Sequence, residues 1–162
     1  MDLSVIVERT KDIELINSIM FNDDIFDVIS EDRVTKENQR FDVYGECWLK
    51  VLCDETLIGL YNFHYINQST LEAHVHILPE FRKAHSAESI IKIYQWIIDE
   101  CDGAVSKFVC NIPSLYPNVL SFCLSNGFTL EGTNRKSHLK NGILHDINMV
   151  GITKKEIIEV LR

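Results

Sequence analysis

One stretch of the sequence constrains the fold more than any other, an apolar stripe with helical spacing that follows Pro79 after a short polar segment. Its members fall at i, i+3, i+4, i+7 and onward: Ala87, Ile90, Ile91, Tyr94, Ile97, Ile98 and Cys101. A stripe of this length belongs to a helix that packs on a sheet. Ser86 is a suitable N-cap, and Gly103 stands where a residue in the left-handed conformation is expected. We therefore predict a long helix that begins at Ser86 and ends before Gly103.

Strands are predicted on both sides of this helix. They cover residues 3–8, 47–53, 56–66, 71–78, 107–112, 129–140 and 143–152, and shorter helices cover residues 12–20, 24–29, 117–126 and 154–161. The dipeptide Asn141-Gly142 is a strong signal for a hairpin between the last two strands. Because hairpin and crossover connections are mixed, we predict an α/β (α+β mixed) fold with a mostly antiparallel mixed sheet of about six to seven strands and helices on both faces. Residues 1–162 are expected to form a single domain.

The composition excludes several classes of partner. Among 162 residues, 46% are hydrophobic and 25% charged, and 16 Lys+Arg against 24 Asp+Glu give a net charge of −8. This balance argues against a nucleic-acid partner and against an anionic membrane surface. No apolar stretch is long enough to span a membrane. The five cysteines are odd in number and lack C-x-x-C spacing, which favours reduced thiols in a cytoplasmic protein.

Two junctions carry family-like motifs. Residues 77–87 read I-L-P-E-F-R-K-A-H-S-A, where a strand meets the long helix, and residues 126–132 read N-G-F-T-L-E-G, where a helix meets a strand. The second motif continues through Arg135, Asn141-Gly142 and Asp146. In this order the motifs resemble the GCN5-related N-acetyltransferase (GNAT) superfamily, and in particular its RimJ/RimL-like branch. Small acetyltransferase-like proteins of tailed phages are also similar.

The resemblance implies acetyl-CoA as co-substrate, bound at a splayed strand pair. Backbone groups of Ile77 and Leu78 would hold the pantetheine. The pyrophosphate would lie at the start of the long helix, on Arg82, Lys83, Ala84, His85, Ser86 and Ala87. A helix N-terminus offers unpaired N–H donors and partial positive charge, which suits an anion. His85 stands where the family usually has glycine.

Candidate catalytic residues lie on one strand and one helix. Alternation places Glu72, His74 and His76 on one face of their strand, where a carboxylate and two imidazoles could relay a proton. The alternative is a partly solvated face with structural histidines. Cys123 occupies the slot in which many family members have the tyrosine that protonates the leaving thiolate. The alternative for Cys123 is core packing, since it shares an apolar helix face with Val119 and Phe122.

The histidines and the acidic segments raise two further possibilities, a metal site and an acceptor site. The H-x-H pair at His74 and His76 could bind a metal through two imidazoles, but no Cys/His or H-E-x-x-H spacing completes it, so we predict no metal.

Residues 22–27 and 31–40 are expected to cover the acceptor, and their carboxylates would attract a cationic amine. The alternative is an ordinary solvated acidic surface.

Two functional hypotheses follow. The first is an acetyl-CoA-dependent N-acetyltransferase that acts by direct transfer on a primary amine, either a protein N-terminus or a small polyamine-like amine. The second is a catalytically inactive GNAT-fold interaction or assembly protein, for which the resemblance allows a phage origin. Under either hypothesis the expected location is the cytoplasm, which is the host cytoplasm if the protein is phage-encoded. His85 in place of glycine and Cys123 in place of tyrosine favour the second hypothesis. A homodimer or another assembly partner is compatible with either.

Overall fold

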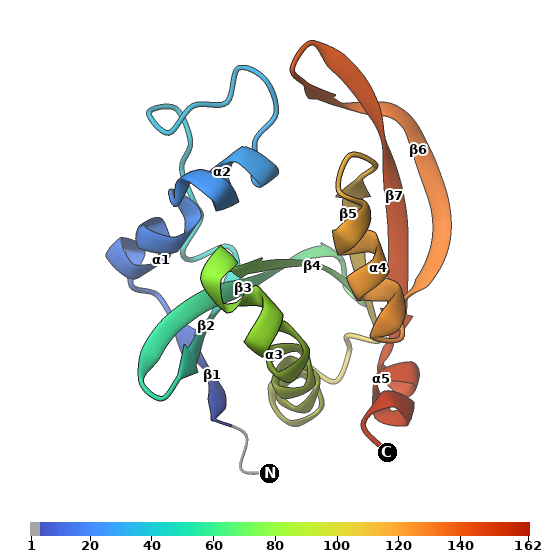
Figure 1. Ribbon diagram of the computed structural model, residues 1–162. Helices are drawn as coiled ribbons and strands as arrows, with labels where there is room; N and C mark the ends of the chain where they lie inside the picture. The colour runs from blue at the N-terminus through green and yellow to red at the C-terminus, as the bar shows by residue number, and fades with distance from the viewer. Residues whose placement is uncertain (1–3) are drawn as a thin grey trace. The chain divides into compact units, whose positions relative to one another are not determined.

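Residues 4–162, which the computed structural model describes, form seven strands and five helices (Figure 1). In chain order these are β1 (Val5–Thr10), α1 (Ile13–Met20), α2 (Asp23–Ile29), β2 (Cys47–Cys53), β3 (Thr56–Asn67), β4 (Thr70–Ile77), α3 (Pro79–Glu100), β5 (Lys107–Pro113), α4 (Pro117–Ser125), β6 (Thr129–Lys140), β7 (Ile143–Thr153) and α5 (Lys154–Val160). The strand order is β1-β2-β3-β4-β5-β7-β6. The pair β4–β5 is parallel, whereas β1–β2, β2–β3, β5–β7 and β6–β7 are antiparallel. The predicted mixed, mostly antiparallel sheet is confirmed.

The start of α3 differs from the prediction. The helix begins at Pro79, with Leu78 as N-cap, and continues without interruption to Glu100. The prediction of a start at Ser86 is therefore wrong. Proline is preorganised for the first helical position and lacks the N–H that would stay unpaired there, and no glycine follows to interrupt the helix. Arg82 adds a bond across this junction, since its Nε donates to the Ile77 carbonyl at 2.9 Å.

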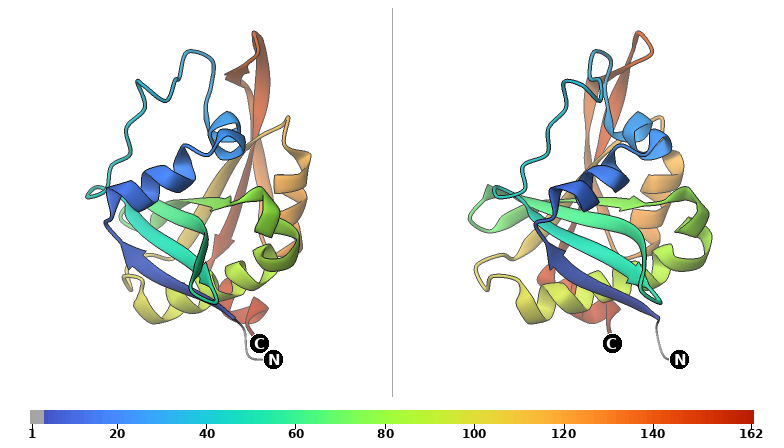
Figure 2. Two further views of the ribbon diagram at one scale, coloured as in Figure 1. Left: turned by 60° about the vertical axis from the view of Figure 1, so that its left-hand side comes forward. Right: turned by 90° about the vertical axis from the view of Figure 1, so that its left-hand side faces the viewer.

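The chain divides into two compact units, so the predicted single domain stays a prediction. The first unit comprises residues up to Ser30, Thr35–His64 and Ala73–Cys101. Helices cover both faces of its strands, as predicted (Figure 2). On one face α1 and α2 pack on Trp48 and Leu60, in a cluster completed by Ile16, Ile19, Met20, Ile25 and Val43. On the other face α3 packs on the alternate residues of β3: Tyr61 bonds Ser89 at 2.9 Å, and Phe63 stacks on Trp96.

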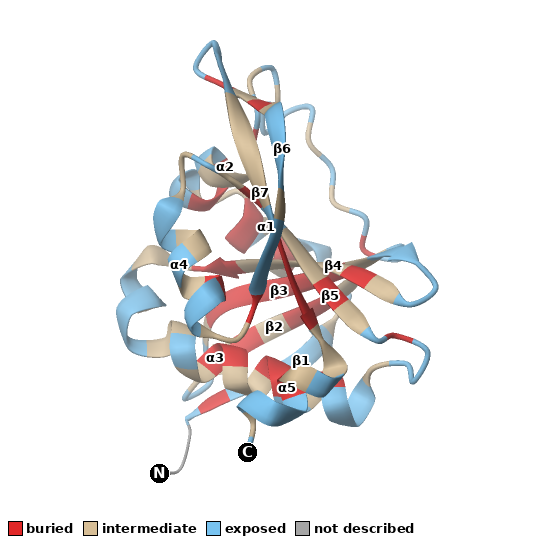
Figure 3. Ribbon diagram, turned by 90° about the vertical axis from the view of Figure 1, so that its right-hand side faces the viewer, coloured by how far each residue is buried: buried red, intermediate tan, exposed pale blue. Residues whose placement is uncertain are grey.

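The backbones of β3 and β4 approach each other closely at Gly59. A Cβ on this residue would lie 2.9 Å from the Cα of Ile77 and closer still to the His76 carbonyl oxygen. Just beyond, the Leu78 N–H donates to the Ile58 carbonyl at 2.9 Å, so β3 also fixes the residue that precedes α3. Buried residues concentrate on these strands and on the inner side of α3 (Figure 3).

The second unit comprises Glu31–Val34, Tyr65–Glu72 and Asp102–Arg162. Its centre is β7, which pairs with β5 on one side and with β6 on the other. Asn141 and Gly142 form the predicted turn between β6 and β7, both with positive φ (53° and 75°). A capping box between Thr153 and Glu156 begins α5. Among the described residues, no helix is long and apolar enough to span a membrane.

Gly59→Ala is expected to lower the free energy of unfolding by about 1–3 kcal/mol, the usual cost of overpacking a core, because the added methyl group meets backbone atoms that cannot move aside. Urea denaturation of both proteins measures the difference. The matched control is Gly103→Ala, since a Cβ at Gly103 meets nothing within 4 Å. Equal midpoints for the Gly59 variant and the wild type would contradict the close approach of β3 and β4.

Candidate functional site

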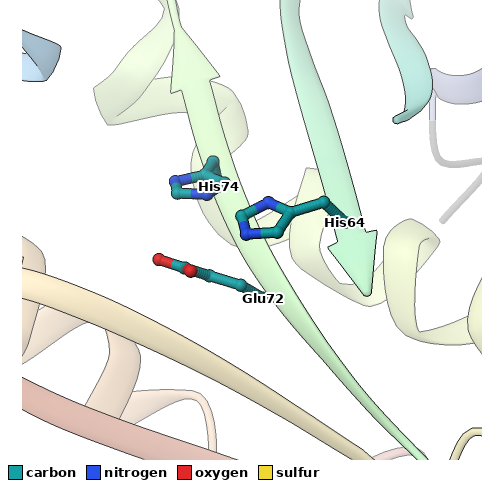
Figure 4. A group of neighbouring side chains, drawn as sticks. All are labelled: His64, Glu72 and His74. Atoms are coloured by element: carbon teal, nitrogen blue, oxygen red, sulfur yellow. The ribbon is translucent and has the colours of Figure 1, made fainter. Parts of the chain in front are cut away.

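Three histidines form a row on one face of β3 and β4. The rings of His64 and His74 stack with centroids 5.4 Å apart, and those of His74 and His76 with centroids 6.3 Å apart. The interplanar angles are 17° and 7°. The strand alternation that predicts His74 and His76 on one face is thus confirmed. His64, on the neighbouring strand, belongs to the same row, which no local spacing in the sequence predicts (Figure 4).

His76 lies at the buried end of this row. Its side chain is 7% exposed, and its Nε2 is 2.9 Å from Asn62 Oδ1. The Asn62 Nδ2 donates to the carboxylate of Glu46, which leaves Oδ1 as the acceptor for His76. This chain of bonds assigns the proton of the neutral imidazole to Nε2. Burial, with a smaller effect from His74, lowers the pKa of His76 to about 3. His76 therefore stays neutral near pH 7, and the geometry favours the structural role for it over proton relay.

Glu72 precedes His74 by two residues on β4. Asn111 of β5 donates its Nδ2 to Glu72 Oε1 at 3.0 Å, which orients the carboxylate. His64, Glu72 and His74 are each half-buried, and one ligand atom of each lies within 4.8 Å of the others (Figure 4). A carboxylate and two imidazoles, partly accessible, are groups that can accept a proton or hold a cation.

Cys123 is buried in α4 and pairs with a second thiol. Its side chain is 4% exposed, which agrees with the core-packing alternative. The hydrogen bond with Cys123, together with burial, raises the pKa of Cys110 well above the ordinary thiol range. The same bond lowers the pKa of Cys123, and burial opposes it. Glu72 also contributes to the raised pKa of Cys110, so Glu72 and the two thiols share one neighbourhood in the second unit.

The predicted coenzyme segment is mostly helix. Because α3 begins at Pro79, the backbone N–H groups of Ala84, His85, Ser86 and Ala87 lie beyond the first turn, where each bonds within the helix. They are not a preformed pyrophosphate cradle, which corrects the sequence analysis. The Leu78 N–H is likewise bonded, to Ile58, and the Ile77 carbonyl accepts from Arg82. What this segment does present to solvent is the pair of cations Arg82 and Lys83, both exposed.

His85 is engaged by neighbours on the first unit. Its Nδ1 lies 3.6 Å from Glu88 Oε2, and the Cys53 Sγ is 3.8 Å from its Nε2. Glu88 also accepts the Val5 N–H through Oε1 at 2.9 Å, so it ties α3 to β1. The imidazole that replaces the usual glycine therefore packs against β2.

Part of the predicted acidic acceptor region has a structural role instead. The two carboxylate oxygens of Asp32 accept the N–H groups of Asn141 and Gly142, each at 2.8 Å, and Glu31 accepts the Leu139 N–H at 2.8 Å. The bonds from Gly142 and Asn141 lower the pKa of Asp32. These carboxylates hold the turn of the last hairpin, and the sequence analysis missed this because more than 100 residues separate the partners.

A surface pocket of about 480 Å³ lies in the first unit, between α1 and the segment at residues 39–44. Phe21, Phe41 and Tyr44 supply aromatic surface, and Lys11 and Arg40 supply positive charge. Asp42 is the one carboxylate among the lining residues, so the cations outnumber it.

Comparison with known proteins establishes the fold. No protein-family model matches the chain, and the search of curated proteins found no match. Among solved structures, a spermidine N-acetyltransferase from Vibrio cholerae in complex with CoA and spermine aligns with a TM-score of 0.78 and 18% identity, covering 96% of this chain and 98% of that one. A point mutant of the spermidine N-acetyltransferase SpeG from Vibrio cholerae aligns at 0.77 and 16%, covering 96% of each chain. The spermidine/spermine N-acetyltransferase SpeG from the same organism with manganese ions aligns at 0.72 and 15%, again covering 96% of each. The chain therefore has the fold of these acetyltransferases over nearly its whole length.

The buried neutral state of His76 predicts that stability depends on pH. The unfolded chain protonates this imidazole near 6.5 and the folded chain only near 3, so its contribution is fully present above pH 6.5 and is lost as pH falls toward 3. Within this window the slope is up to about 1.4 kcal/mol per pH unit. Urea denaturation between pH 7.5 and about 4 measures the slope. His76→Gln keeps a donor for Asn62 and should flatten it.

The same prediction has a direct readout in NMR. The Cε1–H shift of His76 should stay constant between pH 7.5 and about 4.5 in the folded protein, because the ring does not titrate there. A titration midpoint near 6.5 would show that the imidazole is neither buried nor held neutral by Asn62.

Proposed function

We propose that the chain is an acetyl-CoA-dependent N-acetyltransferase that acts on a small polyamine-like primary amine by direct transfer. The observation that carries the proposal is the shared fold, which aligns over 96% of the chain with an acetyltransferase structure that contains CoA and spermine. The motifs at residues 77–87 and 126–132 support membership of the GNAT superfamily and of its RimJ/RimL-like branch. We also propose a cytoplasmic location, which is the host cytoplasm if the protein is phage-encoded.

Direct transfer requires one group to take a proton and another to supply one. The amine nitrogen attacks the thioester carbonyl carbon, the C–S bond breaks, and the products are an N-acetyl amide and the free thiol of CoA. We assign proton acceptance to the Glu72 carboxylate, which Asn111 orients, with His74 as its partner on the same strand. Cys123 is the candidate donor to the departing thiolate, and its bond with Cys110 supports the assignment by lowering its pKa.

The coenzyme diphosphate is assigned to side chains of the first turns of α3. Arg82 and Lys83 are exposed there, and the N-terminal end of the helix adds partial positive charge. Charge-assisted bonds from these two cations replace the backbone donors used by glycine-rich loops. Ile77 remains the candidate contact for the pantetheine on β4.

The acceptor is assigned from charge. A net charge of −8 gives a field that attracts a polycation, and Asp24 and Asp27 of α2 are carboxylates outside the hairpin anchor formed by Glu31 and Asp32. A small polyamine therefore fits better than a protein N-terminus, which carries a single positive charge.

One observation favours a second candidate function, an inactive GNAT-fold interaction or assembly protein. The helix that begins at Pro79 and the packed imidazole of His85 leave no preformed backbone cradle for a pyrophosphate. The two candidates differ in one property, since only the transferase binds the coenzyme.

Glu72→Gln is expected to lower kcat for spermidine acetylation at least about 100-fold, the usual contribution of a general base, and to leave coenzyme affinity unchanged. Product formation is measured by mass spectrometry with acetyl-CoA and spermidine, in buffer that contains a chelator. The control is Glu159→Gln, an exposed carboxylate of α5, which should retain the wild-type rate.

Coenzyme binding is measured first, as a thermal shift. A concentration of acetyl-CoA 100 times its Kd stabilises the folded chain by about 2.7 kcal/mol, which moves the Tm by several degrees. No shift at millimolar acetyl-CoA would overturn the transferase proposal and select the inactive alternative. A shift together with an unimpaired Glu72→Gln variant would remove Glu72 from the mechanism.

A further inference from the structure

The geometry points to a zinc site made of His64, Glu72 and His74, which the sequence analysis did not identify. The sequence offers six candidate histidines, His64 among them, and one pair with H-x-H spacing on a single strand, His74 with His76. The structure pairs His74 with a histidine from the neighbouring strand instead (Figure 4). The inference concerns metal binding alone and does not depend on the proposed transferase activity.

The two imidazoles of the site belong to adjacent strands of the first unit. His64 lies on β3 and His74 on β4, and their rings stack with centroids 5.4 Å apart. Both side chains are half-buried, so the packed strands restrict them while water can still reach them. Because strand pairing holds the two backbones, a metal ion has to order only the side-chain torsions of these ligands, which lowers the entropy cost of binding.

Glu72 completes the ligand set from the same strand as His74. It stands two residues earlier, so the pleat of β4 turns both side chains to one face. One ligand atom from each of the three residues lies within 4.8 Å of the others. Tetrahedral zinc, with bonds of about 2.0–2.2 Å, needs ligand atoms about 3.4 Å apart. Rotation about the terminal torsions, which are broad for His and Glu, closes this difference.

Asn111 gives the site an outer-shell partner. Its Nδ2 donates to Glu72 Oε1 at 3.0 Å, which orients the carboxylate. Such outer-shell bonds to a ligand carboxylate orient it and tune metal affinity.

The site excludes His76 for a physical reason. The Nε2–H of His76 is committed to Asn62 Oδ1 in the buried chain of bonds that ends at Glu46. To bind a metal through Nε2, His76 would have to lose its proton and the hydrogen bond to Asn62. His76 is only 7% exposed, so water could not replace that bond. The row of histidines thus divides into a structural end at His76 and a metal-binding end at His74 and His64.

The ligand chemistry selects zinc among the common cations. Two imidazoles and one carboxylate suit zinc and its neighbours copper, nickel and cobalt, whereas magnesium and calcium prefer all-oxygen sites. Three protein ligands leave one tetrahedral position for water, the pattern of an open rather than a closed zinc site.

The test uses the full chain, freed of metal with a chelator and then exchanged into chelator-free buffer. Titration with zinc chloride in a calorimeter should give one saturable site, and cobalt(II) should give the intense visible absorption of tetrahedral coordination. His64→Gln and His74→Gln should each weaken zinc binding at least about tenfold. Asn111→Ala should weaken it about 10–100-fold, the usual effect of removing an outer-shell partner.

The matched control is His145→Gln, a histidine of β7 outside the cluster, which should bind zinc as the wild type does. Thermal melts without metal establish that each variant is folded. The inference is overturned if the folded His64→Gln variant binds zinc as tightly as the wild type, or if the wild type shows no saturable binding. Since coenzyme binding is measured separately with a chelator present, failure of the metal site is distinguishable from failure of the proposed function.

Discussion

The close approach of β3 to β4 at Gly59 is the constraint on which the first unit depends. With no side chain at this position, the β3 backbone can lie against the His76 carbonyl and Ile77 Cα. The Ile58 carbonyl then accepts the Leu78 N–H, which places the N-cap of α3 at the end of β4. One contact thus fixes the strand pair that carries the histidine row and the residue at which the long helix begins.

This strand pair places its three histidines in two different environments, one buried and one half-buried. His76 is buried and donates to Asn62, so its pKa is low and it stays neutral. His74 and His64 are half-buried beside Glu72, so their ring nitrogens can accept a proton or coordinate a metal ion. Because both uses draw on the same groups, a zinc ion at this cluster would compete with Glu72 and His74 for proton transfer.

The sequence predicts local features of this fold well and long-range ones poorly. Alternation and turn residues predict the strands, the Asn141-Gly142 hairpin and the shared face of His74 and His76, since these depend on neighbours in the chain. The anchoring of that hairpin by Asp32, and the pairing of His64 with His74, depend on strand packing that no local pattern encodes. The predicted start of α3 at Ser86 is wrong because the polar residues before Ser86 lack an apolar stripe, although Pro79 favours a helix start at its own position.

Because α3 is continuous from Pro79, residues 84–87 hold no free backbone donors. Hydrogen–deuterium exchange of these amides in the free protein measures this. We expect protection close to that of Ser89 and Ile90, deeper in the same helix. Exchange of Ala84, His85, Ser86 and Ala87 at the rate of an open loop would contradict it and would restore the backbone cradle for a diphosphate.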